Sequence, residues 1–159
     1  MKTCVDQRGM TLVELLVASA IAAMLVGVLG SAIFQFMQAT EQGNDQFRAM
    51  QDIRNAGHWI AWDGKGAQTT NLIEGTDPVE SVTLSWTDGG RAHTSTYSLS
   101  GTDLRRDHNG TVTTVARHIS SVGFSISQGV ITTTLISSPE GRRGVSKDTT
   151  YKTCLRPAE

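Results

Sequence analysis

The first forty residues differ sharply in hydrophobic pattern from the rest of the chain. From Leu15 to Thr40 there is neither a charged side chain nor a proline. The apolar residues of this run would cover every side of a helix, and the run is long enough to cross the hydrocarbon core of a bilayer. The pattern therefore predicts a helix whose surroundings are apolar, either a membrane or the core of an assembly of helices.

Beyond this run the helical period continues, but one side becomes polar. The positions expected on the apolar side are Phe47, Met50, Ile53, Gly57 and Ile60. The positions expected to face water are Glu41, Asp45, Arg48, Asp52 and Arg54. We expect one helix from residue 10 to about 63, ended by Gly64 and Gly66. Its distal rings are expected to pack on a sheet: His58, Trp59 and Trp62.

From about residue 80 the apolar period changes from helical to two, which is typical of strands. Three tight-turn sequences separate pairs of alternating segments: Asp88-Gly89-Gly90, His108-Asn109-Gly110 and Ser127-Gln128-Gly129. A last strand is expected over residues 149–155, after a loop at 139–146. We therefore expect an α+β fold, in which an antiparallel meander packs one apolar face on the amphipathic helix half. Residues 64–80 are expected to form a linker or a variable loop.

Composition and motifs give no indication of catalysis. The net charge of −1 provides no general attraction to nucleic acid. The four histidines are scattered, no phosphate loop or nucleophile motif occurs, and we expect no metal, no cofactor and no enzymatic activity. Two arginine pairs are too sparse to predict a nucleic-acid surface, and whether either forms another binding surface stays open: Arg105-Arg106 and Arg142-Arg143.

The start of the apolar run carries the most specific motif, Arg8-Gly9-Met10-Thr11-Leu12-Val13-Glu14. Thr11 and Glu14 have the spacing of a helix capping box. A secretory signal peptide is disfavoured, because Glu14 would interrupt its apolar region and that region continues past the small residues at 18–20. The stretch closely resembles the leader of type IV prepilins, in which a short polar leader ends in glycine and glutamate is the fifth mature residue.

This resemblance implies a defined maturation and architecture. A prepilin peptidase would cut after Gly9 and N-methylate Met10, and Glu14 would pair with the Met10 amine of a neighbouring subunit to set register. The family has a lollipop shape, with a long helix packed on an antiparallel sheet. The corresponding parts here are a leader (1–9), a membrane or filament-core helix (10–37), an amphipathic helix half (38–63) and a β head (64–159).

The same cleavage decides the cysteine content of the mature chain. It would remove Cys4 and leave Cys154, so that no intramolecular disulfide could form. We expect Cys154 to be a buried strand residue rather than a reactive thiol.

Later segments resemble the J-type minor pseudopilins of type II secretion: Tyr97-Ser98-Leu99, Leu104-Arg105-Arg106, Val115 to Ile119, and Val122 to Ser125. That resemblance implies a subunit near the tip of a pseudopilus, with other pseudopilins and an inner-membrane platform as partners. The head would lie on the periplasmic side of a single-pass anchor. Because the chain is shorter than J-type subunits, a minor pilin of a type IV pilus or a DNA-uptake filament stays open. So does a single-pass membrane protein with a periplasmic binding module.

Overall fold

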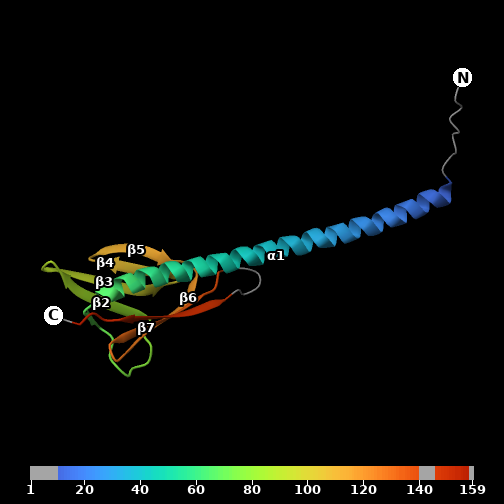
Figure 1. Ribbon diagram of the computed structural model, residues 1–159. Helices are drawn as coiled ribbons and strands as arrows, with labels where there is room; N and C mark the ends of the chain where they lie inside the picture. The colour runs from blue at the N-terminus through green and yellow to red at the C-terminus, as the bar shows by residue number, and fades with distance from the viewer. Residues whose placement is uncertain (1–10, 140–145, 158–159) are drawn as a thin grey trace, which may run out of the picture. The chain divides into compact units, whose positions relative to one another are not determined.

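The computed structural model describes residues 11–139 and 146–157. It contains one long helix, α1 (Leu12–Gly66), and eight strands (Figure 1). The strands are β1 (Thr69–Thr70), β2 (Ser81–Asp88), β3 (Arg91–Ser100), β4 (Asp103–His108), β5 (Thr111–Ala116), β6 (Ile119–Ser127), β7 (Val130–Ser137) and β8 (Lys147–Cys154). All the strand pairs are antiparallel. The expected α+β class is confirmed.

The chain separates into two compact units, residues 1–41 and 42–159. The described part of the first unit is the beginning of α1. It presents its large apolar side chains outward, since Leu12, Met24 and Phe36 are each more than 70% exposed. The second unit contains the rest of α1 and all the strands.

The strands form two sheets rather than the single meander that we expected. One sheet has the order β1-β2-β3-β4-β5, and the other has the order β6-β7-β8. The three expected hairpin turns occur where predicted, because strands end at Asp88, His108 and Ser127. The segment expected to be a linker at 64–80 instead contains β1 and a bridge from Val79 to Phe124 of β6.

One side of α1 packs on both sheets and forms the core of the second unit. The buried helix residues are Ala49, Ile53, Ala56, Gly57, Ile60, Asp63 and Gly64. Of these, Ala56 and Ile60 join a cluster that includes Leu84, Tyr97, Leu104, Phe124 and Leu135 from the strands. The expected apolar face was therefore wrong at two positions, since Phe47 is 77% exposed and Met50 is 51% exposed. Alanines and glycines face the sheets beside Ile53 and Ile60, and their small size lets the helix backbone approach the strands closely.

Helix α1 and strand β8 pack against each other closely. A Cβ added to Gly57 would overlap the Tyr151 ring at Cζ and both Cε atoms, and a Cβ added to Gly64 would lie 2.7 Å from Cγ2 of Thr153. The Tyr151 hydroxyl also donates a hydrogen bond to the Ile53 carbonyl, at 3.3 Å. These two glycines, one helical heptad apart, therefore set how near β8 lies to α1.

We predict that Gly57→Ala destabilises the folded head by about 1–3 kcal/mol, because the Tyr151 ring must move to admit the methyl group. Gly43→Ala is the matched control: that position has open space around it, and alanine is the better helix former by up to about 1 kcal/mol. The measurement is the urea midpoint followed by tryptophan fluorescence. Equal midpoints for the two variants would contradict the close packing of β8 on α1.

Candidate functional site

Helix α1 begins in a reciprocal cap. The Glu14 amide donates to Oγ1 of Thr11 at 3.3 Å, and the Thr11 amide donates back to Oε2 of Glu14 at 3.1 Å. The Thr11 hydroxyl donates to the same Oε2 at 3.0 Å. The capping-box interpretation of the sequence is confirmed. The expected cleavage and methylation residues, Gly9 and Met10, lie outside the described residues.

The helix that follows is suited to an apolar environment. Its length and its mean hydropathy of 2.5 over the best 18-residue window are enough to cross a membrane. The hydroxyl groups of Ser19, Ser31 and Thr40 donate to carbonyls three or four residues earlier, at 2.8–2.9 Å. Because these polar atoms are satisfied within the helix, they add little to the cost of placing it in hydrocarbon. Glu14 is the exception, since it is the lone charge between Arg8 and Glu41.

The second half of α1 carries a buried acid that the sequence analysis did not single out. The Asp63 side chain is 1% exposed, and its two oxygens accept hydrogen bonds from Nε and Nη2 of Arg106, at 2.7 and 2.8 Å. The Tyr97 hydroxyl donates to Oδ2 at 2.5 Å. The guanidinium of Arg106 lies over the ring of Trp59, 4.9 Å from its centroid. This cluster ties the end of α1 to β3 and β4.

The electrostatics of this cluster keep Asp63 ionised. Burial alone would raise the pKa of its carboxyl group, but hydrogen bonds from Arg106, Tyr97 and Ser95 outweigh burial and hold the pKa below its ordinary value. Burial, together with the bond to Asp63, raises the pKa of Tyr97, which therefore stays a neutral donor. The bond to Asp63 also raises the pKa of Arg106. Since Asp63 is ionised near neutral pH, its ion pair with Arg106 and the Tyr97 hydrogen bond act as a structural clamp between α1 and the strands.

A second link joins α1 to the connection between β5 and β6. Asp52, expected to face water, is half-buried and accepts hydrogen bonds from the Arg117 amide at 3.2 Å and from Nδ1 of His118 at 3.0 Å. His118 has a positive φ of 54°, a conformation that is uncommon for residues other than glycine but that histidine adopts more readily than most. The Asp52 carboxylate helps to hold that turn.

Three rings stack near the tip of the β2–β3 hairpin. The centroids of Trp86, His93 and His108 lie 5.6–5.9 Å apart. The Asn109 amide nitrogen lies 3.2 Å from Nδ1 of His93, and the Ser95 hydroxyl lies 2.8 Å from Nδ1 of His108. Within the described part of the chain, no group of three or more His, Cys, Asp or Glu side chains could hold a metal ion.

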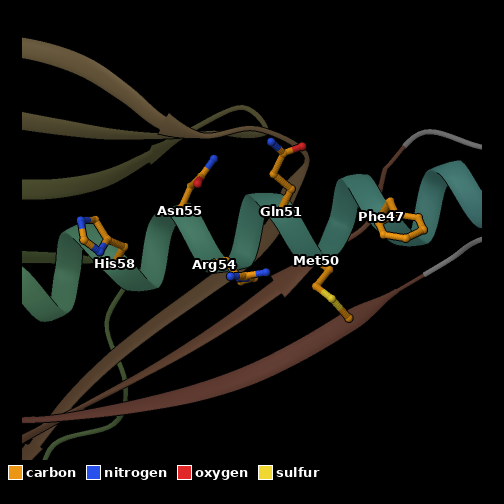
Figure 2. Close-up of a pocket in the computed structure, with 6 residues that line it drawn as sticks. All are labelled: Phe47, Met50, Gln51, Arg54, Asn55 and His58. Atoms are coloured by element: carbon orange, nitrogen blue, oxygen red, sulfur yellow. The ribbon is translucent and has the colours of Figure 1, made fainter.

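The outward side of α1 presents a shallow pocket lined by Phe47, Met50, Gln51, Arg54, Asn55 and His58. Figure 2 shows all six side chains projecting from the same stretch of helix. Trp62 extends this surface one turn further and is 68% exposed, and Trp59 is 40% exposed. The expectation that the distal rings pack on a sheet was therefore wrong for His58 and Trp62. Large exposed apolar side chains in one place are typical of an interaction surface.

Three residues noted in the sequence can now be placed. Arg106 belongs to the Asp63 clamp rather than to a surface patch, whereas its neighbour Arg105 is exposed on the other face of the sheet. Cys154 is exposed, which contradicts the expected burial: Tyr151 and Thr153 face α1, so the next residue along the strand must face away. The Arg142-Arg143 pair lies outside the described residues.

Residues 5–30 match the family described as the prokaryotic N-terminal methylation motif. No curated protein and no solved structure matches the chain significantly. The motif, the apolar half of α1 and the α+β fold support a type IV pilin-like subunit. Such a motif implies processing by a prepilin peptidase, assembly with other pilins, and anchoring in a membrane. The family is structural rather than catalytic.

We predict that Asp63→Asn destabilises the head by about 3–5 kcal/mol, because it leaves the guanidinium of Arg106 largely buried without a counter-charge. Asp52→Asn is the control, since the Asp52–His118 pair is more exposed than the Asp63–Arg106 pair and its loss should cost about 1 kcal/mol. Urea unfolding of both variants measures the difference. Similar losses of stability in the two variants would contradict the role assigned to Asp63.

The ion pair between Asp63 and Arg106 should make the free energy of unfolding depend on pH. Because the pKa of Asp63 is lower in the folded chain, its contribution to stability is present above the unfolded value of about 3.9 and is lost as pH falls toward the folded value. The free energy of unfolding of the native chain should therefore fall more steeply below pH 4 than that of Asp63→Asn. Parallel acid curves would show that Asp63 is not held ionised by the fold.

Proposed function

We propose that this chain is a minor pseudopilin, a structural subunit at or near the tip of a type II secretion pseudopilus that supports protein export. The observation that carries the proposal is Glu14. It is the fifth residue counted from Met10, it lies inside the matched methylation motif, and it is the lone charge in a stretch of more than thirty residues.

Maturation begins with a cut between Gly9 and Met10 by the prepilin peptidase, which also methylates the new N-terminus. The α-amine created on Met10 is cationic near neutral pH. It lies one residue before Thr11, whose side chain caps the helix. The cut therefore leaves the cap intact and places a positive charge at the N-terminus of an apolar helix.

The cap does not neutralise Glu14. All the hydrogen bonds to its carboxylate from described residues go to Oε2 and come from Thr11, which is uncharged. No donor among residues 11–139 and 146–157 reaches Oε1. Burial of an unpaired carboxylate in hydrocarbon costs several kcal/mol, and a cationic amine from a neighbouring subunit would offset that cost. Pairing between staggered helices would fix the axial register of the filament.

The head supports a role in contacts with neighbouring subunits. The outward side of α1 offers Phe47, Met50 and Trp62 to neighbours, and the sheets hold that half of the helix firmly through the Asp63 clamp. The segments that resemble J-type subunits contribute Tyr97 and Arg106 to this clamp, and Val122 and Phe124 to the core. The proposed place is the inner membrane, with a single anchor and a periplasmic head, until assembly.

A minor pilin of a type IV pilus or a DNA-uptake filament is the second candidate, favoured by the small head. Deletion of the gene separates the two. Loss of secreted proteins from the medium, with surface pili and DNA uptake unchanged, is expected for a minor pseudopilin. Normal secretion with loss of pili or of DNA uptake would replace the proposal by the second candidate.

We predict that Glu14→Ala enters the membrane and is cleaved normally but is recovered in sheared filaments at a small fraction of the native level. Alanine removes the carboxylate and leaves the neighbour's Met10 amine without a partner. A tip subunit lacks one neighbour, so that a partial defect is compatible with this account.

Thr11→Ala is the matched control, because it removes the cap and retains the charge. Loss of a helix cap should cost about 1 kcal/mol of stability and leave filament recovery near the native level. Recovery is normalised to total membrane-bound protein for each variant. Native incorporation of Glu14→Ala, or an equal defect in both variants, would exclude charge pairing as the role of Glu14.

A further inference from the structure

The pocket on the outward side of α1 has the spacing of a surface that receives a second helix. Its lining residues all come from α1, at positions i, i+3, i+4, i+7, i+8 and i+11: Phe47, Met50, Gln51, Arg54, Asn55 and His58. In packed helices a side chain of one helix inserts into a hole between four residues of the other. The first four lining residues form one such hole and the last four form the next.

The pocket runs lengthwise along the helix. Figure 2 shows Gln51 and Asn55 projecting from one side of α1, and Met50 and Arg54 projecting from the other. These are two rows of residues spaced four apart, and the side chains of a neighbouring helix fill the groove between two such rows. The pocket is therefore suited to an elongated partner that lies along α1.

The same surface continues past His58. The His58 ring lies 5.9 Å from the Trp59 ring and 6.4 Å from the Trp62 ring, centroid to centroid. We call the outward strip the pocket residues together with Trp62 and Lys65, both of which are exposed. The outward strip is about 27 Å long at 1.5 Å per residue, and Phe47 and Trp62 place large apolar surfaces near its two ends.

The charges of this helix half are separated between its two sides. Its acids beyond residue 46, Asp52 and Asp63, accept hydrogen bonds on the side of the sheets. Asp45 lies one turn before a fully buried alanine and shares that side. The cations Arg54 and Lys65 are exposed on the outward strip, and no described residue forms an ion pair or a hydrogen bond with their side chains. The outward strip therefore carries positive charge and no acid.

The flanks of the outward strip add further cations. Arg48 is exposed one turn before Asp52. The exposed Arg117 lies beside the helix, because its amide donates to Asp52. On β8, Lys147 is exposed and shares the face of Tyr151, which packs against α1. A partner that lies along the outward strip thus meets an excess of positive charge on both sides.

We propose that the outward strip binds an acidic amphipathic helix of a different protein chain. Apolar side chains of that helix occupy the holes beside Phe47 and Met50 and contact Trp62, and its carboxylates pair with Arg54 and Lys65. This assignment rests on the proposed function, which gives this side of α1 a role in subunit contacts.

Other occupants match the outward strip less well. Residues 15–40 of a second copy carry no charge, so they would cover Arg54 and Lys65 without a counter-charge. The outward strip of a second copy would bring the same cations together. A membrane surface or a nucleic acid would supply negative charge but would not fill two consecutive holes. The holes favour a helix, and the cations favour an acidic one.

The test uses the full chain in neutral detergent micelles and two fluorescent peptides. One peptide has three repeats of Glu-Leu-Ala-Ala-Leu-Glu-Ala, and the other has lysine in place of each glutamate. We expect the glutamate peptide to bind about tenfold more tightly or better, and the difference to shrink as salt screens the charges. Equal binding of the two peptides, or no binding of the glutamate peptide, would overturn the proposal. Neither result depends on a filament, whereas the proposed function fails only if secretion survives deletion of the gene.

Arg54→Glu is the most informative variant, since it reverses the one charge that both holes share. It should weaken binding of the glutamate peptide by about tenfold or more and strengthen binding of the lysine peptide. Arg105→Glu is the matched control, because it makes the same change at an exposed position of β4 and should bind both peptides as the native chain does. The urea midpoints of both variants should stay near the native value, since both side chains are exposed. Equal effects of the two variants on peptide binding would overturn the proposal, because they would show a response to net charge alone.

Tryptophan fluorescence tests the anionic alternatives. Acrylamide quenching should fall when the glutamate peptide is added, because the peptide covers Trp59 and Trp62. It should not fall when phosphatidylglycerol is added to the micelles or when a single-stranded oligonucleotide is added. Shielding by the lipid or by the oligonucleotide, without shielding by the peptide, would assign the outward strip to that ligand and overturn the proposal.

Photochemical cross-linking in cells tests a second copy as the occupant. The photoreactive residue p-benzoylphenylalanine is placed at Asn55 in the outward strip and, as a control, at Thr94, which is exposed on β3. We expect position 55 to give no more product made of two copies than position 94. A larger yield of the two-copy product from position 55 would show that a second copy occupies the outward strip.

Discussion

The main constraint on this structure is that the apolar N-terminal half of α1 is unfavourable in water and has to be covered. From Leu15 to Thr40 the helix has no charged side chain, and the most apolar window is not covered by any part of the described chain. The stabilisation of that surface must therefore come from lipid or from other helices. Under the proposed function, Glu14 at its beginning is a charge whose partner would come from a neighbouring copy in a filament of staggered helices.

In the second half of α1 the buried charge, Asp63, is paired with a residue of the same chain. Asp63 lies on the buried side of the helix and would be costly there alone. Arg106, Tyr97 and Trp59 surround the ion pair, and Gly57 and Gly64 bring β8 close to the backbone. The head thus holds the helix rigidly from inside and leaves Phe47 and Trp62 outside, available for contacts with other molecules.

The sequence predicted the α+β class and the three hairpin turns, because the switch from helical to alternating periodicity and the glycine turns are local properties. Prediction from the sequence failed where tertiary packing determines which residues are buried. Phe47 and Met50 have the right spacing for the core, yet the sheets approach so closely that alanines and glycines are buried instead. An acid at Asp63, three residues after Ile60 on the apolar side, could have indicated the clamp. Its partner Arg106 alternates with Leu104 along a strand and could have been expected to face inward.

The central claim is that the chain is a processed, pilin-like subunit, and the mass of the mature protein in cells that contain a prepilin peptidase tests it most directly. The account predicts a chain that begins at Met10, without residues 1–9, and carries one added methyl group on its N-terminal amine. The same chain in cells without the peptidase should keep its leader. A mature mass that retains residues 1–9 when the peptidase is present would contradict the account.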